Sequence, residues 1–530
     1  MTAQHGRRRA RLRLDRPARV ALALGLAGLG YRLALLLLTV PGSNSDEATF
    51  GLVAMHIAAG RGWPVFLYGQ HYMGTFESYL AAPLFLFFEP SWPLLRVPLL
   101  FLYAAFVLLM YLLTRRLYSP WLATFTVGLL ALGSERVVRD QLTTVGGRPE
   151  VKPAVVLLLL LAVALGQHRS RHRRLTCAVF GLVAGLALWN DWLVLPYLAV
   201  VGVVLLVGCW RDLLGWSGLL LLGGFLIGLL PLIVDNLTAP PGQDSLSVLR
   251  QLSDGESEPA TPSERLRGAI LTGLPLATGL CPSTGCAPWQ AWWGPLYLAL
   301  LLGAAVLAVV GLRRAGGDRI RYLAQLALLL GAALTVLSYA RNTLAATAPL
   351  ATARYLSVLQ ISLPAVLWPL WLLARRTWRR GLAQPVGAMA TLVLAWVTAL
   401  MIYATAVFIG DLDTIRGEER DARELATVMR RAGIRHTYGE YWTCNRLIFN
   451  TREQIVCSVL GEDLRPGQNR HPPYPEQVDA APAPAYVFES GGPADTAFRA
   501  YLERIAVPAR VTEVADYRIY QPAATVRPPG

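Results

Sequence analysis

Three carboxylates stand in a polar segment between two long apolar runs near the start of this chain. Asp46 and Glu47 are adjacent and follow the first membrane-length run, residues 20–40. Glu77 lies toward the end of the same segment, in the sequence GQHYMGTFES. Ionisable groups at a membrane edge are costly and by default indicate function. A carboxylate there can accept a proton from an attacking hydroxyl, so Asp46, Glu47 and Glu77 are our candidate catalytic residues.

The residues before Asp46 predict the helix that must position it. Ser43, Asn44 and Ser45 can cap a helix that starts near Asp46, and Gly60 can end it. The apolar residues of this stretch fall along one side, so we expect the helix to rest in the plane of the membrane interface. A plainer interpretation also stands, in which the two acids only stabilise the helix N-terminus through its dipole.

The end of this polar segment is rich in aromatic residues and histidine. Tyr68, His71, Tyr72 and Tyr79 all lie close to Glu77 in the sequence. Such a surface suits a carbohydrate better than lipid, so we expect His71 and Tyr72 to bind substrate.

The composition identifies a membrane protein. Hydrophobic residues make up 54% of the 530 residues and charged residues only 16%, whereas a soluble domain carries about a quarter of charged residues. The mean hydropathy is +0.42. The net charge of +15 is divided into short arginine clusters between apolar runs, a distribution that sets membrane topology. We therefore expect a polytopic α-helical membrane protein that contacts membrane lipids and no nucleic acid.

The alternation of apolar runs and arginine clusters predicts eleven membrane spans. Their approximate limits are 19–40, 93–113, 119–134, 151–167, 175–190, 193–209, 214–235, 291–312, 322–339, 355–373 and 385–409. The arginine-rich start of the chain belongs in the cytoplasm by the positive-inside rule, and an odd number of spans places the C-terminus outside. The first outside loop is then residues 41–92. Arginine replaces lysine almost throughout, which indicates a GC-rich bacterial genome and hence a bacterial plasma membrane.

The cysteines agree with this topology. Two pairs fall outside the membrane, in the loop before the eighth span and in the tail: Cys281 with Cys286, and Cys444 with Cys457. Cys177 and Cys209 fall at cytoplasmic membrane ends. An oxidising exterior favours two disulfides and two free thiols in this arrangement. Metal binding by the sequence CPSTGC is the alternative for the first pair.

From residue 410 the composition becomes that of a soluble domain. Residues 421–432 have a helical period that Gly433 ends. The stretches HTYGEYW, LIFNT, QIVCSVL, AYVFES and DYRIYQP predict short strands. We therefore expect a membrane domain, residues 1–409, and a small extracytoplasmic α/β domain, residues 410–530, that binds the acceptor or braces the membrane domain.

These features together resemble a known family. An Asp-Glu pair follows the first span, a second acid ends an aromatic and glycine-rich loop, and Ala353-Arg354-Tyr355-Leu356 stands at an outside membrane entry. The layout resembles the lipid-linked-sugar glycosyltransferases with the membrane-embedded GT-C fold. Within them it is similar to the protein O-mannosyltransferase and lipid A aminoarabinose transferase branch, glycosyltransferase family 39. The chain departs from this family in two features that concern the acceptor. Around Glu77 it has TFESYLAAP where relatives carry an acid followed by a Pro-Pro pair. Its tail also lacks the β-trefoil module of the eukaryotic protein mannosyltransferases.

The resemblance implies an activity and roles for single residues. It implies transfer of a hexosyl or pentosyl unit from a polyprenyl-phosphate donor to an extracytoplasmic hydroxyl of a glycan, lipid or protein, with inversion. Asp46 matches the catalytic acid of the family and Glu77 its second acid. Arg354 and Tyr355 match the phosphate-binding Arg-Tyr element, although Arg354 could also be an interface anchor. No cofactor is expected to be required, but a divalent metal stays open because oligosaccharyl relatives use one with paired acids.

A second basic group lies in the segment RDQLTTVGGRPEVK, which the topology places outside. Arg148, Glu150 and Lys152 belong to it, and basic residues outside the membrane depart from the positive-inside bias. An anionic headgroup would explain them, so we add these three residues to the substrate-binding candidates; a solvated loop is the alternative. Asp191 and Asp235 also lie at outside span ends, where helix capping is the simpler interpretation.

Two other classes of function compete with a transferase. The chain could be a transporter or flippase of lipid-linked envelope precursors, although transporters tend to carry charges in mid-span and broken helices at the membrane midplane. It could also be a non-catalytic membrane scaffold whose tail binds a partner.

Overall fold

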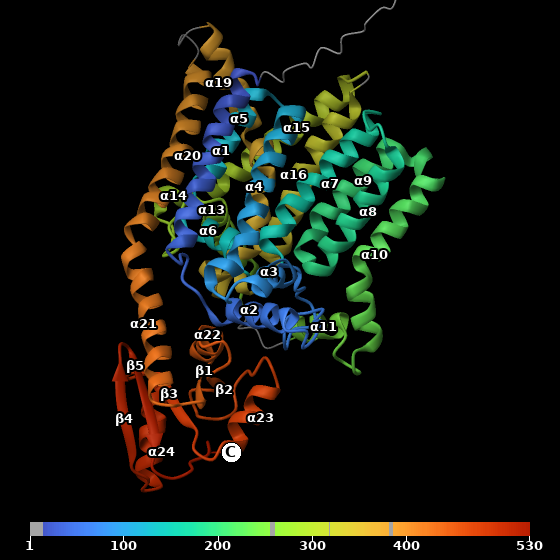
Figure 1. Ribbon diagram of the computed structural model, residues 1–530. Coiled ribbons are helices and arrows are strands. Elements are labelled where there is room, and N and C mark those ends of the chain that lie inside the picture. The colour runs from blue at the N-terminus through green and yellow to red at the C-terminus, as the bar shows by residue number, and fades with distance from the viewer. Residues whose placement is uncertain (1–13, 255–259, 317, 381–384, 530) are drawn as a thin grey trace, which may run out of the picture.

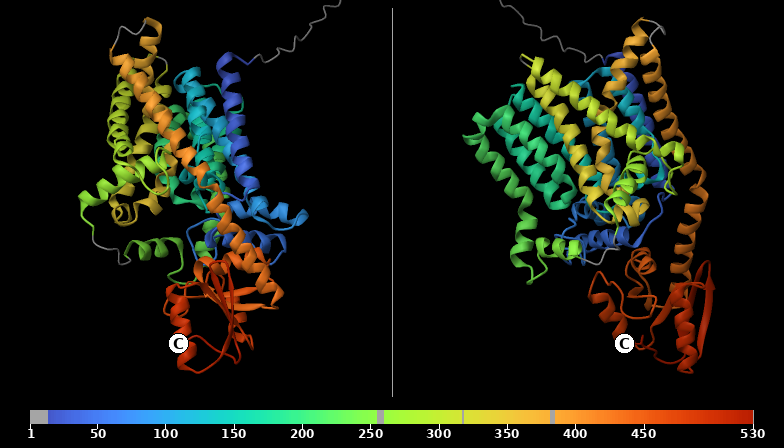
Figure 2. Two further views of the ribbon diagram at one scale, coloured as in Figure 1. Left: turned by 90° about the vertical axis from the view of Figure 1, so that its left-hand side faces the viewer. Right: turned by 180° about the vertical axis from the view of Figure 1, so that it is seen from behind.

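The computed structural model describes residues 14–254, 260–316, 318–380 and 385–529. A bundle of long helices forms one part of the molecule and a small domain of strands and helices lies at one end of it (Figure 1). The first helix begins at the opposite end of the bundle from that domain, as the views in Figure 2 also show. This arrangement confirms the expected polytopic helical protein with a small C-terminal α/β domain.

Nine helical segments in the described ranges are long and apolar enough to cross a membrane. They are α1 (Arg16–Leu37), α4 (Trp92–Leu117), α7 (Arg148–Gly166), η1 (Trp192–Val194) with α9 (Leu195–Leu213), α10 (Trp216–Thr238), α14 (Pro288–Ala291) with α15 (Trp293–Arg314), α16 (Arg319–Arg341), α18 (Pro349–Thr352) with η3 (Ala353–Ser362) and α19 (Leu363–Arg380), and α20 (Pro385–Gly410) with α21 (Leu412–Arg431). Each coincides with one of the eleven predicted spans.

The two remaining predicted spans are helices of another kind. α5 (Pro120–Ala131) is followed after a bend of 92° by α6 (Glu135–Leu142), and the pair is apolar enough to count as one broken span. α8 (Arg173–Asn190) has 18 residues and packs in the bundle against α7 and α10, but two arginines at its start lower its hydropathy. The count of eleven spans therefore stays a prediction.

Short helices connect the long ones. At the end of the bundle that faces the small domain lie α2 (Ser45–Ala58), α3 (Phe76–Phe87) and α11 (Ser245–Asp254). The other connecting helices are α12 (Pro262–Gly268), the π-helical turn η2 (Ala269–Gly273), α13 (Leu274–Ala277) and α17 (Leu344–Thr347). α2 does not expose one side to solvent as expected for a helix in the interface, because 12 of its 14 residues are buried.

The C-terminal domain is built on a five-stranded sheet. Its strands are β1 (His436–Glu440), β2 (Val456–Leu460), β3 (Ala485–Glu489), β4 (Ala509–Val514) and β5 (Tyr517–Pro522), in the order β2-β1-β3-β5-β4. β1 is parallel to both of its neighbours, whereas β5 is antiparallel to β3 and β4. Its helices besides α21 are α22 (Tyr441–Asn450), α23 (Pro473–Ala480) and α24 (Pro493–Arg504). The strand expected at LIFNT is wrong: those residues lie in α22 and at its end.

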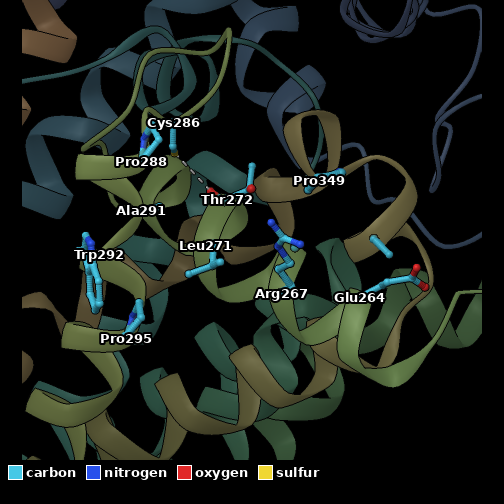
Figure 3. Close-up of a pocket in the computed structure, with 12 residues that line it drawn as sticks. Glu264, Arg267, Leu271, Thr272, Cys286, Pro288, Ala291, Trp292, Pro295 and Pro349 are labelled. Atoms are coloured by element: carbon cyan, nitrogen blue, oxygen red, sulfur yellow. Dashed lines mark hydrogen bonds between the residues drawn. The ribbon is translucent and has the colours of Figure 1, made fainter.

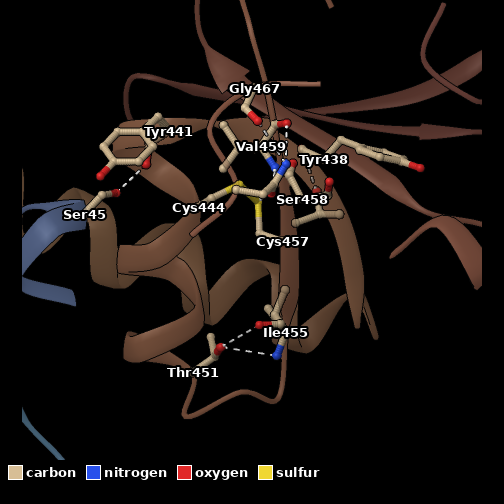
Figure 4. Close-up of a disulfide and its surroundings, with 12 residues drawn as sticks. Ser45, Tyr438, Tyr441, Cys444, Thr451, Ile455, Cys457, Ser458, Val459 and Gly467 are labelled. Carbon is tan, nitrogen blue, oxygen red and sulfur yellow. Dashed lines mark hydrogen bonds between the residues drawn. A yellow bond between two sulfur atoms is a disulfide. The ribbon is translucent and has the colours of Figure 1, made fainter. Parts of the chain in front are cut away.

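Both expected disulfides are present. Cys281 bonds Cys286 with a Cα–Cα distance of 5.1 Å. Cys444 of α22 forms a disulfide with Cys457 of β2, with a Cα–Cα distance of 5.2 Å (Figure 4). This bridge therefore joins a helix to a strand. Cys177 and Cys209 are free and buried.

The C-terminal domain shares a hydrophobic core with the first loop. Phe449 packs against Trp92, with ring centroids 4.5 Å apart, and both belong to a buried cluster that includes residues of α2, α3 and the sheet. Polar contacts reinforce it: Asn445 donates to Thr49 at 3.0 Å and Trp92 to Asn450 at 2.8 Å. The tail is therefore seated on α2, and the two expected domains are in close contact.

Candidate active site

A polar cavity of about 360 Å³ lies where the first loop, α7 and η3 meet. Its walls are formed by Asp46, Gln70, Tyr72, Met73, Val145, Gly146, Arg148, Asp191, Trp192, Leu193, Leu249, Arg354 and Tyr355. Five of the residues selected from the sequence as substrate-binding or catalytic are thus brought together from four separate parts of the chain: Asp46, Tyr72, Arg148, Arg354 and Tyr355. Its lining includes two acidic side chains, Asp46 and Asp191, and two basic ones, Arg148 and Arg354.

Asp46 is presented to this cavity by the first turn of α2. Asn44 caps the helix by accepting a hydrogen bond from the amide of Glu47 at 2.9 Å, and Gly60, just past the end of the helix, has a φ of +67°. The expected capping is confirmed. The Asp46 side chain is 31% exposed, so its carboxylate can be reached from the cavity.

Asp46 also contacts the C-terminal domain, which the sequence analysis did not anticipate. The Tyr441 hydroxyl donates a hydrogen bond to Oδ1 of Asp46, and Nη2 of Arg470 lies 2.9 Å from the same oxygen. Arg470 is only 7% exposed. No pattern in the sequence marked these two residues, because they are 395 and 424 positions from Asp46.

Glu47 points away from the cavity and is fully buried. Both of its oxygens accept hydrogen bonds from Arg96, at 2.7 and 2.6 Å, and the amide of Thr144 donates to Oε1 at 3.1 Å. A bidentate guanidinium–carboxylate pair of this kind fixes two helices relative to each other. The expectation of a catalytic Glu47 is corrected on this ground: α2 and α4 are joined by it, and it leaves no oxygen free for substrate.

Glu77 and Glu150 form a buried pair behind the cavity wall. Glu77 accepts from the amide of Gly146 at 3.0 Å, while Glu150 accepts from the amide of Gly147 at 2.9 Å and from the side chain of Asn190. Burial, together with the charge of Glu150, raises the pKa of Glu77 well above its ordinary value. Neither carboxyl lines the cavity; both hold the Gly146–Gly147 turn that does, where each glycine has a positive φ.

The basic residues divide into two groups. The Arg354 guanidinium lines the cavity, with Nη2 3.4 Å from the hydroxyl of Tyr355, and no ion pair to it is found among the described residues. Arg148 also lines the cavity and lies 3.4 Å from Asp140. Lys152 is 1% exposed and donates to the backbone oxygen of Asp140 at 3.1 Å, so it supports the wall from behind.

His71 and Tyr72 are adjacent but lie differently. Tyr72 lines the cavity, whereas Nδ1 of His71 lies 3.9 Å from Asp235, outside it. Asp191 caps η1, as expected, by accepting from the amide of Leu193 at 2.8 Å. It also lines the cavity, and burial raises its pKa to about 7.

A larger and more open pocket of about 670 Å³ lies elsewhere, between α12, η2 and the start of α15 (Figure 3). Its walls include Trp292, Leu271 and Pro295, and its ionisable lining side chains are Glu264 and Arg267. Without a carboxylate facing a buried cation, it offers less chemistry than the smaller cavity at Asp46. The described residues contain no group of three or more His, Cys, Asp or Glu side chains arranged to hold a metal.

Solved structures of two other proteins share this architecture. ArnT from Cupriavidus metallidurans in the apo state superposes with a TM-score of 0.58 at 14% identity, over 94% of this chain and 98% of ArnT. The same ArnT bound to undecaprenyl phosphate superposes with a TM-score of 0.55 at 15% identity, over 95% of this chain and 97% of ArnT. The oligosaccharyltransferase of Archaeoglobus fulgidus in the apo form superposes with a TM-score of 0.53 at 13% identity, over 89% of this chain and 69% of the other.

The chain has the GT-C fold. The resemblance recognised in the sequence is confirmed at the level of fold, and at 13–15% identity the activity has to be argued from the site. No family model and no curated protein matches the chain. Within this GT-C fold, Asp46 and Arg354 belong to two elements far apart in sequence, α2 and η3, that meet at one cavity.

Proposed function

We propose that this protein transfers a sugar from a polyprenyl-phosphate donor to an acceptor hydroxyl, with inversion at the anomeric carbon. The observation that carries the proposal is the cavity whose lining combines the Asp46 carboxylate with the guanidinium groups of Arg354 and Arg148. A base and a pair of cations in one small space suit an acid–base step next to a departing phosphate.

The chemistry assigned to these groups is a single displacement. The acceptor oxygen attacks the anomeric carbon, the bond from that carbon to the phosphate oxygen breaks, and the hydroxyl proton passes to Asp46. Polyprenyl phosphate leaves with the bonding electrons, and Arg354 and Arg148 stabilise its added charge through hydrogen bonds to phosphate oxygens. One base and one displacement give inversion without a covalent sugar–enzyme intermediate.

An apolar cavity next to the site supports a lipid-linked donor. It has a volume of about 490 Å³ and shares Trp192, Leu193 and Tyr355 with the polar cavity. Its remaining walls come mostly from apolar residues of α9 and α16, Leu195 and Leu334 among them. A prenyl chain in this groove would place its phosphate at Tyr355 and Arg354. ArnT, which has the same fold, has been solved with undecaprenyl phosphate bound.

We assign supporting roles to the candidates that lie behind the cavity wall. Glu47 braces α2 against α4 through Arg96. Glu77 and Glu150 hold the turn that leads to Arg148, and Lys152 anchors the same region through Asp140. Substrate binding is left to Tyr72, Arg148, Arg354 and Tyr355.

The same proposal includes the orientation of the protein in a bacterial plasma membrane. The Cys444–Cys457 disulfide belongs to the C-terminal domain, whereas α1 begins at the other end of the bundle (Figure 1). Disulfides persist in oxidising compartments, so we place the C-terminal domain and the cavity outside and the start of the chain in the cytoplasm.

The test is turnover of a defined donor by the purified protein in lipid nanodiscs. Radiolabelled polyprenyl-phosphate hexoses and pentoses would be offered with glycan, lipid and peptide acceptors. The expected result is release of polyprenyl phosphate and label in the acceptor, both lost in Asp46→Asn, with the opposite anomeric configuration in the product by NMR. Movement of intact donor across proteoliposomes without sugar release would support the flippase instead.

A further inference from the structure

The C-terminal domain places a tyrosine and an arginine on the proposed catalytic base. The Tyr441 hydroxyl donates to Oδ1 of Asp46 and accepts from Nε and Nη2 of Arg470, at 2.9 and 2.7 Å. Arg470 Nη2 reaches the same Oδ1 at 2.9 Å. In the amide orientation that satisfies both groups, the Gln70 oxygen accepts from Nη1 of Arg470 at 2.6 Å. The guanidinium is therefore held on three sides.

Both contacts fall on one oxygen of the carboxylate. No hydrogen bond to Oδ2 of Asp46 is found among the residues that the structure describes. The carboxylate is thus fixed in rotation, with one oxygen engaged by the C-terminal domain and the other left to the cavity. The Arg470 guanidinium and the Tyr441 hydroxyl both donate charge-assisted hydrogen bonds to that one oxygen.

Attachment of the domain does not by itself explain a buried Arg470. The seat of the domain on α2 is supplied by Phe449 against Trp92 and by the hydrogen bond from Asn445 to Thr49. Burying a guanidinium is costly unless it is paired and hydrogen-bonded, and its partner here is Asp46. The contact is therefore better explained by what it does to that carboxylate.

We propose that Tyr441 and Arg470 are positioning residues that hold Oδ1 of Asp46 and turn its Oδ2 toward the acceptor, so that the C-terminal domain completes the active site. The inference rests on the proposed role of Asp46 as the base. The other titratable or charged residues that line the cavity with Asp46 are Tyr72, Arg148, Asp191, Arg354 and Tyr355; all of them remain in the variants described below.

The experiment measures kcat and the KM for donor in Arg470→Gln, Arg470→Lys and Tyr441→Phe. Loss of the cation or of the hydroxyl is expected to lower kcat by about tenfold or more. The KM for donor should be unchanged, because neither residue lines the cavity. Arg470→Lys should recover part of the lost kcat because it restores a charge but not the fork of donors.

The matched control is Asn445→Ala, on the same helix as Tyr441. It removes a contact between α22 and α2 without touching Asp46, so it should lower the melting temperature and leave kcat near the wild-type value. If Arg470→Gln does not fold, Tyr441→Phe, which removes a single oxygen atom, decides the question.

The outcomes separate the two proposals. Wild-type kcat values for Arg470→Gln and Tyr441→Phe, while Asp46→Asn is inactive, overturn the positioning role alone. A change confined to KM also overturns it, since Arg470 would then bind substrate directly. Full activity in Asp46→Asn overturns the proposed function and this inference with it.

Discussion

The ring of Phe449 lies directly on the backbone of Gly51, and a Cβ atom at Gly51 would come within 2.5 Å of that ring. A glycine inside a helix costs about 1 kcal/mol relative to alanine. Its presence in the middle of α2 is explained by this close approach, which lets the C-terminal domain sit against the helix that carries Asp46.

Gly51→Ala should therefore loosen the C-terminal domain. The added methyl group would force Phe449 out of its place, and overpacking of this kind costs about 1–3 kcal/mol. We expect a lower melting temperature and faster proteolysis of the tail. Gly30→Ala in α1 is the control, because nothing lies within 4 Å of a Cβ there. Equal melting temperatures for both variants would show that the contact is not tight.

Asp46→Asn and Glu47→Gln should fail in different ways. The amide at position 46 cannot accept a proton, so transfer should fall by about 10²–10⁴-fold while the fold is kept. Glu47→Gln leaves the buried Arg96 unpaired, a change that typically costs about 3–5 kcal/mol, so its first effect should be on stability. The two variants are compared by yield, melting temperature and turnover; a stable but inactive Glu47→Gln would contradict the bracing role.

Arg354→Ala should weaken donor binding and slow transfer, and Arg354→Lys should restore binding only in part, since the bidentate geometry is lost. Titration with polyprenyl phosphate measures the affinity directly. Arg341→Ala is a suitable control because that arginine is exposed and lies outside the cavity. Equal affinity for wild type and Arg354→Ala would identify Arg354 as a membrane-interface anchor.

Thiol labelling tests the orientation. In intact cells an impermeant thiol reagent should reach Cys444 and Cys457 only after reduction, since they form a disulfide. Cys177 and Cys209, which are free, should stay protected until the membrane is permeabilised and the protein is denatured. Labelling of the tail cysteines only after permeabilisation would place the C-terminal domain in the cytoplasm.

Low pH should weaken the contact that Glu453 of the tail makes with His56 and Arg61 of the first loop. Burial alone would raise the pKa of Glu453, but hydrogen bonds from His56 and Arg61 outweigh it and lower the pKa to about 2, from an ordinary value of 4.5. The stabilisation is thus fully present above pH 4.5 and is lost as the pH falls toward 2. Tyr474 also donates to this carboxylate, at 2.9 Å.

The measurement is the melting temperature of wild type and Glu453→Gln as a function of pH. The wild type should be more stable at pH 7, and the difference should shrink below pH 4.5. Glu424→Gln, at an exposed position of α21, should show no such trend. A difference in melting temperature that is constant with pH would mean that the charge of Glu453 does not stabilise the contact between the tail and the first loop.

Local patterns in the sequence were sufficient for some parts of the structure. The cap at Asn44 and the pairing of Cys281 with Cys286 depend on residues a few positions apart, and the long apolar runs fixed most of the helices. The proposed site could be approached because Asp46 and Arg354 stand at the ends of such runs. Adjacent residues on a helix point about 100° apart, which is why only one of the two neighbouring acids reaches the cavity.

Other parts depend on contacts that no local pattern reveals. LIFNT has the composition of a strand, yet Cys444, Leu447 and Ile448 are spaced by three and four residues and are buried together in α22. Their burial against the sheet and α2 outweighs the strand propensity. Tyr441 and Arg470 were missed for the same reason, because only the folded tail brings them to Asp46.

The shared core of α2 and the tail has a consequence for the order in which the protein matures. A chain is synthesised from its N-terminus, and Ser45 meets Tyr441 only after 396 further residues have been made. Until then the face of α2 that the tail will cover has no partner, and Asp46 lacks its contacts with Tyr441 and Arg470. Under the two proposals above, a chain whose helices are already in the membrane would still lack the groups that hold its base, so competence to react would arrive with the last part of the protein to fold.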